Sequence, residues 1–390
     1  MLSSIALILL VGMFAGFICK KLHFPGLFGM ILTGVVLGPH MLNCIDGSIM
    51  NISAELRKMA LIIILIRAGL TLNLGDLKKV GRPAVLMCFL PACFEITGMV
   101  LLAPMLLGLS IKEAALLGAV IAAVSPAVIV PKMIKLIEDG YGTQKGIPQL
   151  ILAGASVDDI FVIVLFSAFT SLVQGENMSV MEFINIPVSV ILGIFLGIVL
   201  GLLLSLTFRK IHIRDTVKGV LILCVSFLLV SFEDMLPTVI SFSSLIAVMF
   251  MGIAVKMKRE PVAKRLSVKF NKLWICAEVF LFVLVGAQVD LQYVGETGWA
   301  AVALILLVLC FRSIGVFCCL LGTKLSGKEK LFCMVSYLPK ATVQAAIGSI
   351  PLSLGLSCGN VVLSVAVLAI LITAPLGAFL IDLTYQKFLV

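Results

Sequence analysis

The stretch PQLILAGASVDDIFVIVLFSAFTSL, from Pro148 to Leu172, is apolar enough to cross a bilayer and yet carries Asp158 and Asp159 near its middle. A carboxylate at bilayer depth costs about 2.5–3.5 kcal/mol even on the lenient insertion scale, so an intramembrane acid indicates a functional site. Adjacent residues of a helix project about 100° apart, so the two acids can face different partners. The alternative is that a buried Arg or Lys merely satisfies both acids, although neutral residues would pack there at lower cost.

The composition around this stretch is that of a polytopic helical membrane protein. Of the 390 residues, 61% are hydrophobic and 13% are charged, and the mean hydropathy is +1.22. No segment between the apolar runs has the length of a soluble domain, so we expect one integral membrane domain over residues 1–390. The net charge of +9 would suggest nucleic acid in a soluble protein, but basic loops on one side of a bilayer explain it here. The eleven cysteines form no CxxC motif and are typical of small buried residues.

Apolar runs of about 17–25 residues predict thirteen transmembrane spans, at 3–19, 26–42, 57–73, 83–107, 113–137, 148–172, 187–208, 218–235, 239–256, 273–290, 298–322, 330–352 and 360–382. Lys and Arg cluster at the ends of odd-numbered spans and in the loops that follow them, and only Arg57, Lys58 and Lys112 fall on the opposite side. By the positive-inside rule the N-terminus lies outside and the C-terminus is cytoplasmic. We interpret the basic stretch from Lys256 to Lys272 as a solvated cytoplasmic linker, with a lipid-binding amphipathic patch as the alternative.

Two pairs of short motifs indicate an inverted repeat. Span three ends with AGLTLNL and span ten with VGAQVDL, while span five contains SPAVIVP and span twelve contains LPKATVQ. These matches align Gly69 with Gly286, Asn73 with Asp290, Leu74 with Leu291, and Pro126 with Pro339. Both pairs lie seven spans apart, so the partners cross the membrane in opposite directions. The predicted fold is therefore an all-α polytopic membrane protein in which helices 1–6 and 8–13 form inverted repeats linked by helix 7.

Three prolines, Pro126, Pro131 and Pro339, lie in the middle of spans five and twelve. Proline lacks an N–H and clashes with the preceding turn, and its matching positions in both repeats favour two unwound helices over simple kinks. Broken helices at the membrane midplane expose carbonyls and helix ends that can hold an ion. Ser125 and Thr342 supply hydroxyl oxygens beside these breaks, although a lone Ser or Thr more often bonds back to its own helix.

The remaining intramembrane charges are Arg67, Glu95, Glu278, Arg312 and Lys340. Together with the two aspartates they come close to electrical balance, which favours pairing inside the protein over exposure to lipid. Lys340 follows Pro339, where an ammonium can neutralise the carbonyl end of a broken helix. We expect Lys340 to cluster with Glu278, with Arg67 as a further candidate. We also expect Arg312 to pair with Glu95, which would leave both aspartates without a cationic partner.

The motifs SPAVIVP, GASVDDI, LIRAGLTL and LPKATVQAA together resemble the cation:proton antiporter superfamily, specifically its NHA-type branch of double-aspartate sodium/proton antiporters, from about Phe24 to Pro375. The resemblance implies thirteen helices, of which helices 5 and 12 are broken and cross. It also implies a homodimer and an elevator-like motion of a core domain, about 57–172 and 273–390, against a dimerisation domain, about 1–42 and 187–256. Asp159 would be the main cation ligand and Asp158 the supporting one. Many double-aspartate antiporters carry a Lys on helix 11, where this chain has Arg312, which cannot usefully release a proton near neutral pH.

The predicted function is secondary antiport of Na⁺ or Li⁺ against H⁺ in the plasma (inner) membrane. These hard cations prefer oxygen ligands, and burial favours the neutral form of a carboxyl group, so proton and cation compete for Asp158 and Asp159. The sequence has no GxxxxGK[ST] motif, so we expect an ion gradient to drive transport, with neither nucleotide nor nucleic acid as partner, no resident cofactor and no enzyme activity. The alternatives are a sodium-coupled symporter of an organic solute with the same crossed-helix fold, a non-transporting sensor, and an intramembrane aspartyl protease, which needs acids on two different helices.

Overall fold

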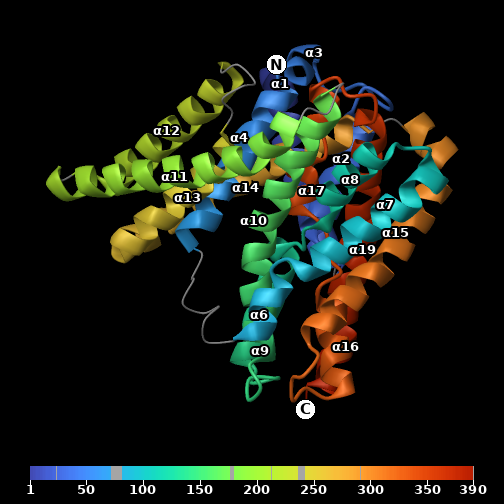
Figure 1. The fold of residues 1–390 in the computed structure, drawn as a ribbon. Helices are drawn as coiled ribbons and strands as arrows, with labels where there is room; N and C mark the ends of the chain where they lie inside the picture. The colour runs from blue at the N-terminus through green and yellow to red at the C-terminus, as the bar shows by residue number, and fades with distance from the viewer. Residues whose placement is uncertain are drawn as a thin grey trace. The chain divides into compact units, whose positions relative to one another are not determined.

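Helices make up the regular secondary structure of the residues that the computed structural model describes, which are 1–22, 24–71, 81–175, 180–211, 213–235, 242–289 and 291–389 (Figure 1). Each of the thirteen predicted intervals overlaps at least one helix. Within the described ranges, nine helical segments are long and apolar enough to cross a membrane. The all-helical, membrane-spanning architecture is therefore confirmed, while the count of thirteen and the inverted repeats stay predictions. Three residues of the repeat match, Asn73, Leu74 and Asp290, lie outside the described residues.

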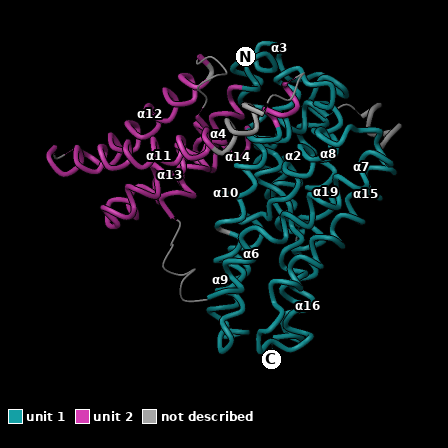
Figure 2. Tube along the Cα trace, viewed as in Figure 1, with its two compact units in different colours: residues 1–54, 73–169, 281–390 teal, residues 55–72, 170–280 magenta. Residues whose placement is uncertain are grey.

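The chain divides into two compact units (Figure 2). Unit 1 comprises Met1–Ala54, Asn73–Phe169 and Leu281–Val390, and unit 2 comprises Glu55–Leu72 and Thr170–Phe280. The units are defined by contacts alone, whereas the predicted core and dimerisation domains concern motion, so that division stays a prediction. The helices of unit 1 are α1 (Leu2–Lys21), α2 (Gly26–Leu37), α3 (Gly47–Asn51), α6 (Arg82–Met87), α7 (Leu90–Leu107), α8 (Ile111–Ala122), α9 (Pro126–Glu138), most of α10 (Ile147–Gln174), α15 (Leu291–Cys319), α16 (Gly327–Ser336), α17 (Thr342–Ile347), α18 (Ile350–Ser353) and α19 (Gly359–Phe388).

Unit 2 is built around the close packing of two helices. Its helices are most of α4 (Ser53–Thr71), α11 (Val180–Lys210), α12 (Asp215–Met235), α13 (Ser244–Lys258) and most of α14 (Glu260–Ala287). Along α11, Gly193, Gly197 and Gly201 recur every four residues, and a Cβ atom at any of them would collide with a backbone carbonyl at or beside α13. Small residues at this spacing let two apolar helices approach closely.

The basic stretch from Lys256 to Lys272 is helical over most of its length, so its interpretation as a linker is wrong. The last turn of α13 ends at Lys258, and α14 begins at Glu260. Pro261 stands in the first turn of α14, where its missing N–H is not needed, and the Ala, Lys, Arg and Leu residues that follow favour a helix. The transmembrane prediction began only at residue 273 because it followed apolarity and not helix propensity.

Two helical spans of unit 1 are interrupted where the sequence places prolines. The first interruption separates α8 from α9, with Ala123 and Ser125 in extended conformations and Pro126 as the first residue of α9. The second separates α16 from α17 and contains Pro339. These two helix breaks are confirmed. Pro131, in contrast, lies inside α9 and is not a break; a transmembrane helix tolerates one such proline because its neighbours re-satisfy the freed backbone groups.

Candidate functional site

The two interrupted spans meet at their breaks within unit 1, and this meeting point is called the crossing below. The backbone N–H of Ser125 donates to the carbonyl of Pro339 at 2.8 Å. Gln344, in α17, connects the same two segments: its Nε2 donates to the carbonyls of Ile121 (3.0 Å) and Ala123 (2.8 Å) at the end of α8. Its Oε1 accepts from the backbone N–H of Ala341 at 2.8 Å. Gln344 therefore satisfies backbone groups on both sides of the crossing.

Arg312, in α15, is the centre of the charged groups at the crossing. Its guanidinium donates to Glu95 Oε2 at 2.6 Å and to Asp158 Oδ2 at 3.1 Å. It also donates to the backbone carbonyls of Ala122, at the end of α8, and of Tyr337, just beyond the end of α16. With five N–H donors in a fixed fork, a guanidinium can serve several acceptors at once. One side chain thus connects α7, α10 and the open ends of both interrupted helices.

The predicted pair of Arg312 and Glu95 is confirmed, but the expectation that both aspartates lack a cationic partner is wrong. Asp158 is not free of a cation, because Arg312 bridges both carboxylates. Lys340 Nζ donates to Glu95 Oε2 at 2.6 Å, and its predicted role at the carbonyl end of the broken helix stays a prediction. The backbone N–H of Lys340 donates to the hydroxyl of Thr373 in α19 at 2.9 Å.

Arg67 and Glu278, the other two predicted members of the cluster, belong to unit 2. Arg67 is in α4 and Glu278 is in α14, and the two side chains attract each other electrostatically. Their predicted association with Lys340 stays a prediction, because Lys340 is in unit 1 and its acidic partner there is Glu95.

The paired charges at the crossing balance, and one acid is left over. Glu95, Asp158, Arg312 and Lys340 are all fully buried and supply two negative and two positive charges. Asp158 Oδ2 also accepts from the backbone N–H of Val124 at 2.8 Å. Asp159 follows directly in α10, and within the described part of the chain no cationic side chain forms an ion pair with it. Its Oδ1 is buried without a hydrogen-bond partner. The site therefore carries one uncompensated carboxylate.

Hydroxyl oxygens beside the crossing are also buried without partners. The hydroxyls of Ser125 and Thr342 and the second carboxylate oxygen of Asp158 accept or donate no hydrogen bond within the described residues. Ser125 stands at the N-terminal cap of α9, where serine normally accepts from a backbone N–H, yet it makes no such bond. Elsewhere in this chain Thr33 and Ser205 bond back to their own helices. The alternative that Ser125 and Thr342 merely bond back to their own helices therefore does not apply here.

Buried oxygens without partners cost free energy unless something else satisfies them. A proton on a carboxylate, or a hard cation among carboxylate and hydroxyl oxygens, would do so. Of the predicted site residues, Asp158, Ser125, Lys340, Glu95 and Arg312 are joined to the crossing by hydrogen bonds or ion pairs. Asp159 and Thr342 adjoin it in sequence. Gln344 is the site residue that sequence analysis missed, because a neutral amide in an apolar helix gives no charge signal.

The chain as a whole is similar to known proteins. A family model described as sodium/hydrogen exchanger, transmembrane, matches residues 5–385. The chain is 34% identical over 383 residues to sodium/hydrogen exchanger 9B2 of Pongo abelii, which covers 94% of this chain and 70% of that protein. It is 32% identical over 380 residues to human sodium/hydrogen exchanger 9B1, covering 94% and 72%. The solved structure of the sodium proton antiporter MjNhaP1 from Methanocaldococcus jannaschii at pH 8 has the same fold, with a TM-score of 0.83 at 24% identity and coverage of 100% of this chain and 98% of that one.

Proposed function

The chain belongs to the sodium/hydrogen exchanger family, and from that premise we propose that it is a secondary antiporter that exchanges Na⁺ or Li⁺ for H⁺ across a membrane. The observation that carries the proposal is the charge balance at the crossing. Arg312 and Lys340 are matched by Glu95 and Asp158, and among the described residues no cation pairs with Asp159. A carboxylate with an oxygen buried without a partner is unfavourable, so in this proposal Asp159 holds either a proton or a metal cation.

Competition between these two occupants supplies the coupling. Both neutralise the same carboxylate, so binding of one requires release of the other, and each carries one positive charge. The hydroxyls of Ser125 and Thr342 and the free oxygen of Asp158 are candidate additional ligands, because they are oxygen donors without other partners. In this proposal Asp159 is the principal cation ligand and Asp158 is the supporting one.

The bridging position of Arg312 bears on the stoichiometry. Arg312 neutralises Asp158 in the same way that Lys340 neutralises Glu95, and a guanidinium does not give up its proton near neutral pH. Only Asp159 is then free to alternate between proton and cation. One H⁺ therefore moves for each Na⁺, and the exchange is electroneutral.

Alternating access follows from the crossed helices. We propose thirteen transmembrane helices with inverted repeats of helices 1–6 and 8–13, each repeat contributing one broken helix to the site. Transporters of this kind work by moving one bundle against another around such a site. The family resemblance assigns the moving core to about 57–172 and 273–390 and the dimerisation domain to about 1–42 and 187–256, with an elevator-like motion.

Orientation and assembly complete the proposal. The distribution of Lys and Arg places the N-terminus outside and the C-terminus in the cytoplasm of a cell whose plasma (inner) membrane holds the protein. We propose a homodimer through the first and eighth predicted spans, residues 3–19 and 218–235. The surface of α1 suits such a contact, because Leu10, Phe14 and Phe17 are each at least 64% exposed. Cross-linking in lipid that detects only monomers would contradict the dimer.

Ion flux in proteoliposomes tests the function. With a pH-sensitive dye inside, an inward Na⁺ gradient is expected to drive H⁺ outward in the absence of any organic solute, unlike in protein-free liposomes. Repeating the assay with Li⁺ and K⁺ gives the cation preference, and clamping the membrane voltage with valinomycin and K⁺ gives the stoichiometry. If H⁺ moves only when an organic solute is added, the sodium-coupled symporter replaces the antiporter.

A further inference from the structure

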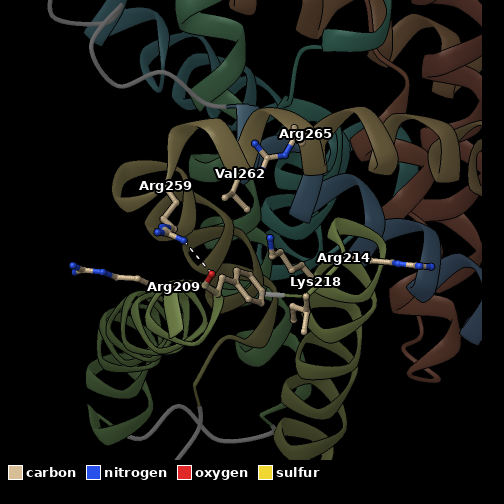
Figure 3. A pocket seen from close by; sticks show the side chains of 8 residues that line it. Arg209, Arg214, Lys218, Arg259, Val262 and Arg265 are labelled. Carbon is tan, nitrogen blue, oxygen red and sulfur yellow. Dashed lines mark hydrogen bonds between the residues drawn. The ribbon is translucent and has the colours of Figure 1, made fainter. Parts of the chain in front are cut away.

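A basic pocket of about 440 Å³ lies in unit 2, where the end of α11 and the beginnings of α12 and α14 meet (Figure 3). It has no part in the ion site proposed above, whose residues belong to unit 1. The side chains that matter for its chemistry are Phe208, Arg209, Arg214, Lys218, Arg259 and Arg265. Five of these six residues are cationic.

Hydrogen bonds hold three of the cations in place. Lys218 Nζ and Arg265 Nε donate to the two oxygens of Asp215 at 2.9 Å and 2.6 Å. Arg259 Nη1 donates to the carbonyl of Phe208 at the end of α11 at 3.1 Å. The Lys218 side chain is only 9% exposed, and its ammonium lies 5.9 Å from the centre of the Phe208 ring. Lysine is seldom buried to this extent, so the arrangement differs from a solvated basic loop.

The pocket carries a surplus of positive charge. Asp215 is the acidic partner of both Lys218 and Arg265, whereas the partner of Arg259 among the described residues is the carbonyl of Phe208. Arg209 and Arg214 are exposed and extend to either side of the pocket (Figure 3). The first turn of α12 adds the positive end of a helix dipole. Guanidinium groups and helix N-termini both match the geometry and charge of a phosphate group.

The surroundings of the pocket indicate that such a phosphate would belong to a lipid headgroup. The apolar segments 188–210 and 215–233, each suited to cross a membrane, end and begin at the pocket. Leu206, Ile211 and Val217, in the adjoining turns, are 54%, 54% and 46% exposed. The cations thus stand where an apolar outer surface stops, which is the level of lipid headgroups at a bilayer surface.

We propose that this pocket binds the headgroup phosphate of an anionic phospholipid, whose acyl chains lie along the exposed apolar side chains of α11 and α12. Basic pockets between transmembrane helices on the cytoplasmic side suit this chemistry. The excess of basic loops expected from the positive-inside rule explains why Lys and Arg occur here. It does not explain a concave site whose cations are fixed by hydrogen bonds to protein groups.

Lipid retention by the purified full chain tests the proposal. Native mass spectrometry would count phosphatidylglycerol bound from mixed micelles that also contain phosphatidylcholine. Arg214→Gln/Arg259→Gln removes two pocket charges while the glutamine at 259 keeps a donor for the Phe208 carbonyl. The matched control is Lys324→Gln/Lys328→Gln, which removes two exposed charges outside the pocket. Phosphatidylglycerol affinity is expected to fall about tenfold to thirtyfold in the pocket variant, as for two basic residues near an anionic lipid, and to stay unchanged in the control.

Three results would overturn the proposal in whole or in part. Equal lipid retention by the pocket variant and the wild type would mean that the pocket does not hold the lipid. An equal loss of phosphatidylglycerol affinity in the control would mean that the lipid responds to the overall surface charge and not to the pocket. Saturable binding of inorganic phosphate or glycerol 3-phosphate that competes with the lipid and is lost in the pocket variant would make the ligand a soluble phosphate compound. If Arg214→Gln/Arg259→Gln does not fold, Arg209→Gln/Arg214→Gln serves instead, because neither exposed side chain holds the backbone.

Discussion

The crossing in unit 1 and the basic pocket in unit 2 are both clusters of charged side chains held by hydrogen bonds, but their residual charges are opposite. At the crossing, two cations and two acids neutralise each other and Asp159 remains. In the pocket, Asp215 is shared by Lys218 and Arg265, and Arg259 has only a carbonyl partner. The first cluster therefore calls for a cation or a proton, and the second for an anion.

The number of charged residues in a membrane protein is therefore less informative than the net charge that remains after ion pairing. Seven intramembrane charges are near balance in the sequence, whereas the ion pairs at the crossing leave out one acid, Asp159, on which the proposed function depends.

The largest effect is expected from removing the unpaired acid at the crossing. Asp159→Asn keeps the size of the side chain but removes the charge that proton and cation share, so exchange in proteoliposomes should fall to the background of protein-free liposomes while the protein stays folded. The control is Asp382→Asn, in which the exposed partner of Lys132 is changed. Wild-type flux in Asp159→Asn would remove this residue from the proposed role.

Replacing Glu95, a paired acid at the same site, should mainly lower the stability of the folded protein. Glu95→Gln leaves two buried cations facing one acid, and breaking a buried pair in this way typically costs about 3–5 kcal/mol. Lys340→Met in the same chain restores the balance, so the double variant should unfold at a higher temperature in detergent than Glu95→Gln alone. Additive destabilisation by the two changes would contradict the pairing as a unit.

Gln344 tests the crossing without changing any charge. Gln344→Leu removes the partners of two carbonyls and one N–H, and each buried group left unsatisfied costs about 1–3 kcal/mol. We expect lower thermal stability together with a higher Na⁺ concentration for half-maximal exchange, because the breaks beside Ser125 would no longer be fixed. The control is Gln386→Leu at an exposed position. Lower stability with unchanged Na⁺ dependence would restrict Gln344 to a structural role.

A balanced pair away from both clusters should have the smallest effect, and only on stability. Burial alone would raise the pKa of Glu329, but hydrogen bonds from Lys145 and Ser326 outweigh burial and hold that pKa below its usual range. The stabilisation is therefore complete above the unfolded-state pKa of about 4.3 and is lost as the pH falls through the lower folded-state pKa. Glu329→Gln keeps an acceptor for the backbone N–H of Ser326 but removes the ion pair with the half-exposed Lys145, so it should cost about 0.2–1 kcal/mol at pH 7.

This cost should disappear in strong acid, where the wild-type carboxylate is also protonated. Thermal unfolding of both proteins in detergent, compared at pH 7 and in strong acid, measures it, with Glu260→Gln as a control at a 61% exposed side chain. A difference that does not change with pH would contradict the assigned role of the Glu329 charge.

The sequence was sufficient to predict the helix breaks, which depend on the backbone chemistry of proline. It also predicted one ion pair, because few other intramembrane charges could form it. Pro126 and Pro339 marked the helix breaks because proline cannot continue a helix there, whereas Pro131 showed that the same residue is tolerated a few positions into a new helix. Arg312 and Glu95 could be paired because few intramembrane charges were left to choose from. The bridge from Arg312 to Asp158 could not be predicted, because sequence does not show how many acceptors one guanidinium reaches.

Other features were hidden because they depend on neutral groups or on propensity. Gln344 carries no charge, and its role appears only when the ends of α8 and α17 lie together. The first turns of α14 looked like a linker because Lys and Arg interrupt the apolar pattern, although those residues favour a helix. The basic pocket depends on that extended helix, so sequence analysis could offer a lipid-binding patch there only as an alternative.

Calorimetric titration of the purified protein with Na⁺ measures cation binding and proton release together, so it tests whether the two ions compete for Asp159. Titrations in buffers of different ionisation enthalpy give the number of protons released for each Na⁺ bound. We expect one proton per Na⁺ in the wild type, and neither binding nor release in Asp159→Asn. Na⁺ binding without proton release, or unchanged binding in Asp159→Asn, would contradict this competition.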